Sequence, residues 1–168
     1  MVACGCASVK DKYGLISYIG VLSNKSQVRP TLYLNDKLAP VLETYAGESM
    51  ADIYIRPLQD LGIKVLLTVL GDWQGIGVAN MTDTQAEQFA TILAYAVEKY
   101  GLDGIGFDDE YANYSGSLVS GSFGNIITKL HALLPADKLI TVFAYGNTSQ
   151  INSTAGALID YAYTDFTY

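Results

Sequence analysis

The chain has 168 residues, a length typical of one domain, and we treat residues 1–168 as a single domain. Hydrophobic residues make up 50% of it and charged residues only 16%, which permits a sizeable core and excludes wholesale disorder. The formal net charge of −7 argues against a nucleic-acid partner and an anionic membrane surface, and no apolar run is long enough for a membrane span.

The two cysteines, Cys4 and Cys6, indicate neither a disulfide nor a metal site. They are two residues apart, a poor spacing for mutual bridging, and no histidine lies near them to complete a zinc site. The same stretch lacks a charged start and a long apolar segment, so no signal peptide is predicted.

The first half of the chain alternates predicted strands and helices. Residues 13–22 are typical of a buried strand, and residues 23–47 are predicted to be mainly loop. A helix is predicted over residues 49–62, with Ser49 as its N-cap and a kink or limit at its internal proline. Residues 63–71 are fully apolar, as in a strand of a parallel sheet. The Gly-rich loop that follows, GDWQGIGVAN, has no lysine and no phosphate-loop spacing, so it does not indicate nucleotide binding.

The clearest helix is predicted over residues 84–101. Thr84 and Glu87 have the spacing of a capping box at its start. Apolar residues recur at helical spacing along it, and Gly101 suits the left-handed conformation that often ends a helix.

The second half continues the alternation. Residues 102–110 are predicted to be a strand, and residues 122–135 an amphipathic helix that carries the only histidine, His131, in a surface or packing role. Two more strands are predicted over residues 138–146 and 158–168. Apolar strands that alternate with amphipathic helices indicate an α/β fold with a parallel sheet, either a barrel or a doubly wound sheet.

The strand over residues 102–110 ends in three adjacent acids. Because side chains alternate along a strand, Ile105 and Phe107 share the face that packs against helices, and Asp108 and Glu110 share the other face. In a βα barrel this other face is the interior, and active sites form at the carboxyl ends of the strands. The two carboxylates are therefore candidates for a catalytic pair, and the alternative is a solvated acidic strand end without a function.

The acidic stretch and its surroundings resemble a known family. LDGIGFDDE resembles the strand-four motif of glycoside hydrolase family 18, Asp-x-x-Asp-x-Asp-x-Glu. The longer stretches IRPLQDLGIKVLLTVLGDWQGIGVAN and YGLDGIGFDDEYANY are similar to bacterial endo-β-N-acetylglucosaminidases of the endoglycosidase H type. The resemblance implies a TIM-type (β/α) barrel that is incomplete, with about strands 2 to 6 of 8 present in this chain.

The resemblance also implies a reaction. Such glycosidases hydrolyse the β-1,4 bond between the two core N-acetylglucosamines of an N-linked glycan, and chitinases of the same family cut chitin. Both retain the anomeric configuration with the substrate's own acetamide as nucleophile, through an oxazolinium ion, so no metal and no organic cofactor is needed. Glu110 would be the general acid and then the base, and Asp108 would orient the acetamide.

Three more residues are implied as contacts to the sugar. Tyr163 and Asp165 share a face of strand six, where the family places such contacts, and Trp73 lies on the loop after strand three. For the two aromatic side chains, ordinary packing is the alternative.

Two departures from the family pattern affect these expectations. Gly106 stands where the motif has its second Asp, which in the family shares hydrogen bonds with the next Asp; we expect weakened catalysis with sugar binding largely kept. The chain is also shorter than the roughly 250 residues of a complete barrel. It is therefore expected to be either part of a longer protein or a curtailed barrel that forms a homodimer.

Two other functions stay open at this point. One is a non-catalytic carbohydrate-binding barrel, which Gly106 and the missing strands favour, and the other is a chitinase acting on chitin oligomers. In each case the expected partner is an N-linked glycan or another saccharide that contains N-acetylglucosamine. By resemblance alone, the setting is a secreted or cell-surface bacterial one.

Overall fold

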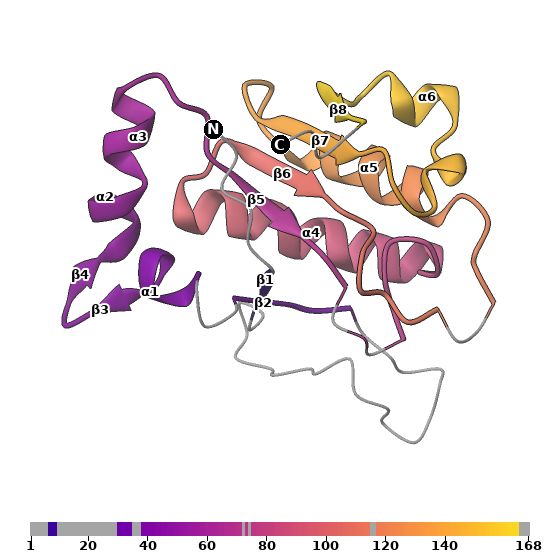
Figure 1. Ribbon diagram of the computed structural model, residues 1–168, viewed down its shortest axis with the longest axis horizontal. Helices are drawn as coiled ribbons and strands as arrows, with labels where there is room; N and C mark the ends of the chain where they lie inside the picture. Colours follow the sequence, from indigo (N-terminus) through magenta and orange to yellow (C-terminus); the bar gives the residue numbers. More distant parts are fainter. Residues whose placement is uncertain are drawn as a thin grey trace.

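A computed structural model gives the fold (Figure 1) and describes residues 7–9 (backbone only), 30–34, 38–71, 73, 75–114 and 117–164. The predicted strand over residues 13–22, both cysteines and Asp165 lie outside these residues. The strands are β1 (Ala7–Val9), β2 (Leu32–Leu34), β3 (Thr44–Tyr45), β4 (Glu48–Ser49), β5 (Leu66–Val69), β6 (Gly104–Phe107), β7 (Leu139–Phe143) and β8 (Tyr161–Tyr163). The helices are α1 (Ala39–Leu42), α2 (Met50–Tyr54), α3 (Arg56–Asp60), α4 (Asp83–Tyr100), α5 (Ser122–Leu133), the 3-10 turn η2 (Thr148–Gln150) and α6 (Ser153–Gly156).

The centre of the molecule is a four-stranded sheet in the order β5-β6-β7-β8, with all three pairs parallel. The strand order follows the chain order, and α4 and α5 connect β5 to β6 and β6 to β7 (Figure 1). Sequential parallel strands joined by helices are the repeating βα unit of a barrel, whereas a doubly wound sheet reverses its strand order. The arrangement confirms the predicted α/β class and favours the barrel.

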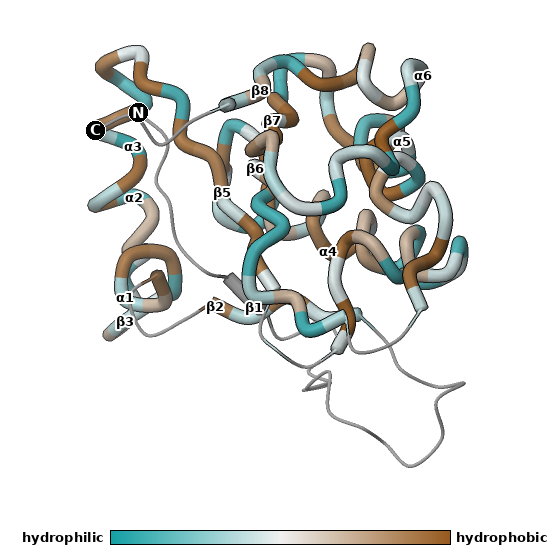
Figure 2. Tube along the Cα trace, turned by 45° about the vertical axis from the view of Figure 1, so that its right-hand side comes forward, coloured by the Kyte–Doolittle hydropathy of each residue, from teal (hydrophilic) through white to brown (hydrophobic). Residues whose placement is uncertain are grey.

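One face of this sheet forms the hydrophobic core with α4 and α5. The ring centroids of Phe107 on β6 and Phe123 on α5 lie 5.6 Å apart, edge to face, and both side chains are fully buried. Ile105 and Phe107 therefore point towards the helices, as the alternation predicted. Figure 2 shows the hydrophobic colouring of β5 and β6 next to these helices. No helix in the described part of the chain is long and apolar enough to cross a membrane.

The opposite face carries a row of small and polar side chains. The backbone register aligns four residues across the sheet: Thr68, Gly106, Thr141 and Tyr161. On β6 this face also carries Gly104, and Asp108 follows two residues beyond Gly106. This is the face that the sequence analysis assigned to the barrel interior.

Local signals at helix ends were read correctly at α2 and at the end of α4. Ser49 caps α2, accepting a hydrogen bond from the Asp52 N–H at 3.3 Å, and the helix gives way to α3 at Ile55, just before Pro57. Gly101 ends α4 in the left-handed conformation, with φ +58°. His131 lies on the exposed surface of α5.

Two predictions of local structure were wrong. The capping box of α4 is made by Thr82 and Gln85, two residues before the expected pair, and Thr84 lies inside the first turn. Thr82 with Gln85 and Thr84 with Glu87 both have the spacing of a capping box, and the helix begins at the earlier pair. The described part of residues 23–47, expected to be mainly loop, holds β2, α1 and β3.

Candidate active site

The two predicted catalytic carboxylates lie at the carboxyl end of β6. The Asp108 N–H donates to the Val69 carbonyl at 3.0 Å, and the Gly71 N–H donates to the Glu110 carbonyl at 2.9 Å. These bonds carry the β5–β6 pairing past the end of the strands. Asp108 is only 3% exposed, and Glu110 is half-buried. Both side chains therefore occupy the end of the sheet where βα barrels place their chemistry.

Asp108 has a raised proton affinity. Burial raises the pKa of its carboxyl from 3.8 to about 6, and the nearby carboxylates of Glu110 and Asp109 add to the effect. The Asp108 carboxyl therefore changes its charge around pH 6. In the described part of the chain, no group of three or more His, Cys, Asp or Glu side chains could hold a metal ion.

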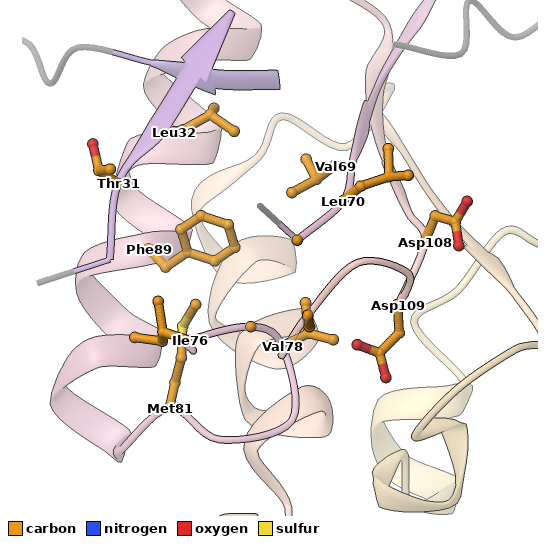
Figure 3. Close-up of a pocket in the computed structure, with 13 residues that line it drawn as sticks. Thr31, Leu32, Val69, Leu70, Ile76, Val78, Met81, Phe89, Asp108 and Asp109 are labelled. Carbon is orange, nitrogen blue, oxygen red and sulfur yellow. The ribbon is translucent and has the colours of Figure 1, made fainter. Parts of the chain in front are cut away.

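A small pocket beside Asp108 and Asp109 belongs to the core rather than to a sugar site (Figure 3). Its volume is about 30 Å³, about the room for one water molecule. Its apolar lining includes Leu32, Val69, Ile76, Val78, Met81 and Phe89. A sugar ring does not fit there, so a saccharide would approach from the exposed side of the strand ends.

Asp109 joins three loops at this end of the sheet. Its Oδ1 accepts the Tyr114 hydroxyl at 2.5 Å, and its Oδ2 accepts both the backbone and the side-chain N–H of Asn147 at 2.8 Å. The Tyr114 hydroxyl also accepts the Ala79 N–H at 3.0 Å, which ties in the loop after β5. Through these bonds Asp109 fixes the segment on which Asp108 and Glu110 lie. Its partners are 5 and 38 residues away, so strand alternation could not reveal them.

Trp73 pairs with a second aromatic residue that the sequence analysis did not select. The backbone N–H of Trp73 donates to the backbone carbonyl of Tyr111 at 2.8 Å, and the two ring centroids lie 5.6 Å apart, edge to face. Trp73 is 62% exposed and Tyr111 is 46% exposed, so packing in the core is excluded for both. Both have positive φ angles (65° and 58°), an uncommon backbone for bulky residues that often marks a functional segment. Tyr111 directly follows Glu110 in the chain, so the two rings offer an exposed aromatic surface beside Glu110.

The other two predicted sugar contacts have different outcomes. Tyr163 lies on β8, half-buried, with its ring 5.1 Å from that of Phe143 on β7. It therefore packs on the sheet while keeping part of its surface exposed. Asp165 follows β8, outside the described residues.

The first Asp of the motif has a structural role at the opposite end of β6. Asp103 accepts the Val65 N–H at 2.9 Å, Gln59 Nε2 at 2.8 Å and Lys64 Nζ at 3.2 Å. Burial by itself would raise the pKa of Asp103, but these hydrogen bonds outweigh burial and hold it below its ordinary value. Asp103 therefore locks β6 to β5, far along the strand from the two catalytic candidates.

The two glycines of β6 differ in what they require. Gly104 has φ +151°, and a Cβ there would lie 2.0 Å from the Leu139 carbonyl oxygen, so a side chain is excluded. Gly106 has no such backbone constraint, and a Cβ there would lie 3.0 Å from Thr141 Oγ1 and 3.5 Å from Thr68 Oγ1. The backbone at position 106 therefore does not require glycine, and a side chain there would need Thr141 Oγ1 to shift slightly.

A parallel βα sheet with two carboxylates and exposed aromatic rings at its carboxyl end is the arrangement expected of a glycosidase built on a βα barrel. No family model matches the sequence. The chain is 38% identical over 147 residues to the endo-beta-N-acetylglucosaminidase of Flavobacterium sp. (strain SK1022), which spans 82% of this chain and 45% of that protein. It is 36% identical over 125 residues to endo-beta-N-acetylglucosaminidase F1 of Elizabethkingia meningoseptica, which spans 67% of this chain and 37% of that protein.

A solved structure agrees with these sequence matches. EndoBT-3987 of Bacteroides thetaiotamicron, crystallised with its Man5GlcNAc product, superposes with a TM-score of 0.69 at 26% identity, over 96% of this chain and 36% of that one. The chain belongs to glycoside hydrolase family 18, in the group of the endo-β-N-acetylglucosaminidases. This confirms the barrel fold, and the chain spans less than half the length of each of these three proteins.

Proposed function

We propose that this chain carries the catalytic strand end of an endo-β-N-acetylglucosaminidase that cuts the β-1,4 bond between the two core N-acetylglucosamines of an N-linked glycan. The observation that supports it most is the placement of Asp108 and Glu110 at the carboxyl end of β6, beside the exposed rings of Trp73 and Tyr111. The relatives are named for this activity, and EndoBT-3987 holds a Man5GlcNAc product.

The two carboxylates have separate tasks in this proposal. Glu110, half-buried and open to the exposed side, gives its proton to the glycosidic oxygen as the bond breaks. The acetamide oxygen of the sugar attacks the anomeric carbon and forms the oxazolinium ion. Asp108 accepts the acetamide N–H, and its negative charge stabilises the positive charge that develops there. Glu110 then takes a proton from the water that opens the ring.

The surrounding residues hold this pair and the sugar in place. Asp109 anchors the segment through Tyr114 and Asn147. Trp73 and Tyr111 supply apolar surface for a sugar ring on the exposed side, and Tyr163 offers its exposed part on β8. Asp165 is kept as a further sugar contact in this proposal. Gly106 leaves Asp108 without a carboxyl neighbour below it, so turnover is expected to be weak.

A second candidate is a non-catalytic domain that binds the same saccharide. It is favoured by Gly106 and by the small share of each relative that the chain spans. A chitinase is less well supported, because both sequence relatives are named endo-β-N-acetylglucosaminidases.

The proposal extends to assembly and setting. Residues 1–168 form one partial barrel domain, and the remaining strands come either from further chain or from a second copy in a homodimer. The relatives are bacterial, and by family resemblance alone we place the protein in a secreted or cell-surface setting. Sedimentation of the purified chain tests the homodimer: a monomer with a cooperative melt and no dye-binding apolar surface would count against it.

The function is tested by incubating the chain with a Man5GlcNAc2 glycopeptide and, separately, with chitin oligomers. Product masses identify the bond that is cut. A peptide that keeps one N-acetylglucosamine supports the proposal, and cleavage of chitin oligomers alone supports the chitinase. Binding of the glycopeptide without any product supports the carbohydrate-binding domain.

A further inference from the structure

The row of side chains on the sheet face below Asp108 is interrupted at Gly106, which has no side chain. We call the space above Gly106 the recess; Thr68 on β5 and Thr141 on β7 flank it in the same row. The point where a side chain at position 106 would begin lies 3.0 Å from Thr141 Oγ1 and 3.5 Å from Thr68 Oγ1. Asp108 is the next residue on this face of the same strand, about 6–7 Å further along.

Three side-chain oxygens on this face of the sheet are buried without a hydrogen-bond partner among the described residues: Thr68 Oγ1, Thr141 Oγ1 and Asp108 Oδ1. The exposed fractions of these residues are 0%, 1% and 3%. A buried polar atom without a partner destabilises a fold, and the three such atoms of the described residues belong to this one face of the sheet. Two of the atoms are hydroxyls that donate and accept, and the third is a carboxyl oxygen.

We propose that the recess at Gly106 is a binding site for ordered water, through which Thr68 and Thr141 position Asp108. The two hydroxyls donate to the water, and the water donates to Asp108 Oδ1, so all three oxygens gain partners. A polar site of this kind, with two or more partners within reach, is where buried waters occur in proteins.

The water site gives the two threonines a role for the reaction. Water that donates to the ionised Asp108 favours its charged form and fixes its direction. Thr68 and Thr141 are therefore positioning residues, acting on Asp108 from the neighbouring strands. The role of this water in catalysis rests on the function proposed for Asp108. Whether the water is bound does not depend on that function. The test therefore measures proton binding by Asp108 and protein stability instead of turnover.

The test compares matched substitutions in the full chain. Thr68→Val and Thr141→Val keep the shape and remove the hydroxyl, whereas Thr68→Ser and Thr141→Ser keep the hydroxyl. The titration of Asp108 is followed by the ¹³C shift of its carboxyl, and stability by urea unfolding. Thr128→Val is the control, since the Thr128 hydroxyl donates to its own helix at Gly124 O, remote from the site.

We expect each valine variant at the site to raise the titration midpoint of Asp108 by about one pH unit. Each should also lower the ratio of folded to unfolded protein about fivefold. The double valine variant should cost less than the sum of the two, because they share the same water. The serine variants and the control should leave the midpoint unchanged.

A dry recess gives the opposite results. Replacing an unpartnered buried hydroxyl by a methyl group then leaves stability unchanged or increases it, and Asp108 titrates as before. Gly106→Ala separates the two cases again, because its methyl group displaces water and raises the Asp108 midpoint in a hydrated recess, but leaves the midpoint unchanged in a dry one. Valine variants that are at least as stable as the natural chain, with an unchanged Asp108 midpoint in the valine and alanine variants, would overturn the inference.

Discussion

Replacing Asp108 by asparagine should remove a pH dependence of stability that the fold builds into this residue. The carboxyl binds its proton more tightly in the folded chain, with a pKa of about 6, than in the unfolded chain, where 3.8 is ordinary. Between these values the folded state binds more protons than the unfolded state. The free energy of unfolding therefore falls as the pH rises from about 4 to about 6.

The size of the effect follows from the shift. A change of about two pK units corresponds to about 3 kcal/mol. Asp108→Asn has no proton to lose, so its stability relative to the natural chain should rise by about 3 kcal/mol between pH 3.5 and pH 7. Urea unfolding followed by circular dichroism at half-unit pH steps measures this difference directly.

A matched control removes an aspartate that is not buried. The Asp137 side chain is 70% exposed, and Asp137→Asn should leave the pH dependence of stability as in the natural chain. If Asp108→Asn is less stable than the natural chain at pH 7 and its pH dependence is unchanged, burial is not what raises the proton affinity of Asp108, and the reasoning about the site is wrong.

Three further predictions concern the residues around this carboxyl. Gly104→Ala should lower the free energy of unfolding by about 2 kcal/mol or more in urea, because its Cβ meets a backbone oxygen, whereas Gly156→Ala, with open space around it, should be neutral or stabilising. Asp109→Ala should cost about 3 kcal/mol in the same assay, since three donors lose their acceptor; an unchanged urea midpoint would contradict its anchoring role. Trp73→Ala and Tyr111→Ala should each weaken glycopeptide binding about 3- to 10-fold in calorimetry with little change in stability, and equal affinity would exclude the aromatic surface as a sugar contact.

The parts of the fold that depend on local pattern could be predicted from the sequence. β6 was predicted from its short apolar run, and the end of α4 from Gly101, because each signal lies within the element itself. The start of α4 was misplaced by two residues because Thr82 and Thr84 both fit the local rule. The spacing rule alone does not distinguish these two starts.

The candidate site was predicted in part for a similar reason. Asp108 and Glu110 follow from strand alternation and the motif, and the structure places both at the expected strand end. Asp109 and Tyr111 were missed because their roles depend on contacts between loops and on positive φ angles, which alternation along one strand does not encode. The water site proposed at Gly106 could not be predicted from the sequence, because it depends on which residues of three neighbouring strands lie side by side.

The most direct test of the central claim compares single-turnover cleavage of a one-site high-mannose glycoprotein by three proteins: the natural chain, Gly106→Asp and Glu110→Gln. The account predicts a product that keeps one N-acetylglucosamine, formed faster by Gly106→Asp because its carboxyl reaches the recess beside Asp108. It predicts at least a hundredfold loss, roughly the contribution of a general acid, in Glu110→Gln. Cleavage by Glu110→Gln at the rate of the natural chain, or no cleavage by any of the three, would contradict it.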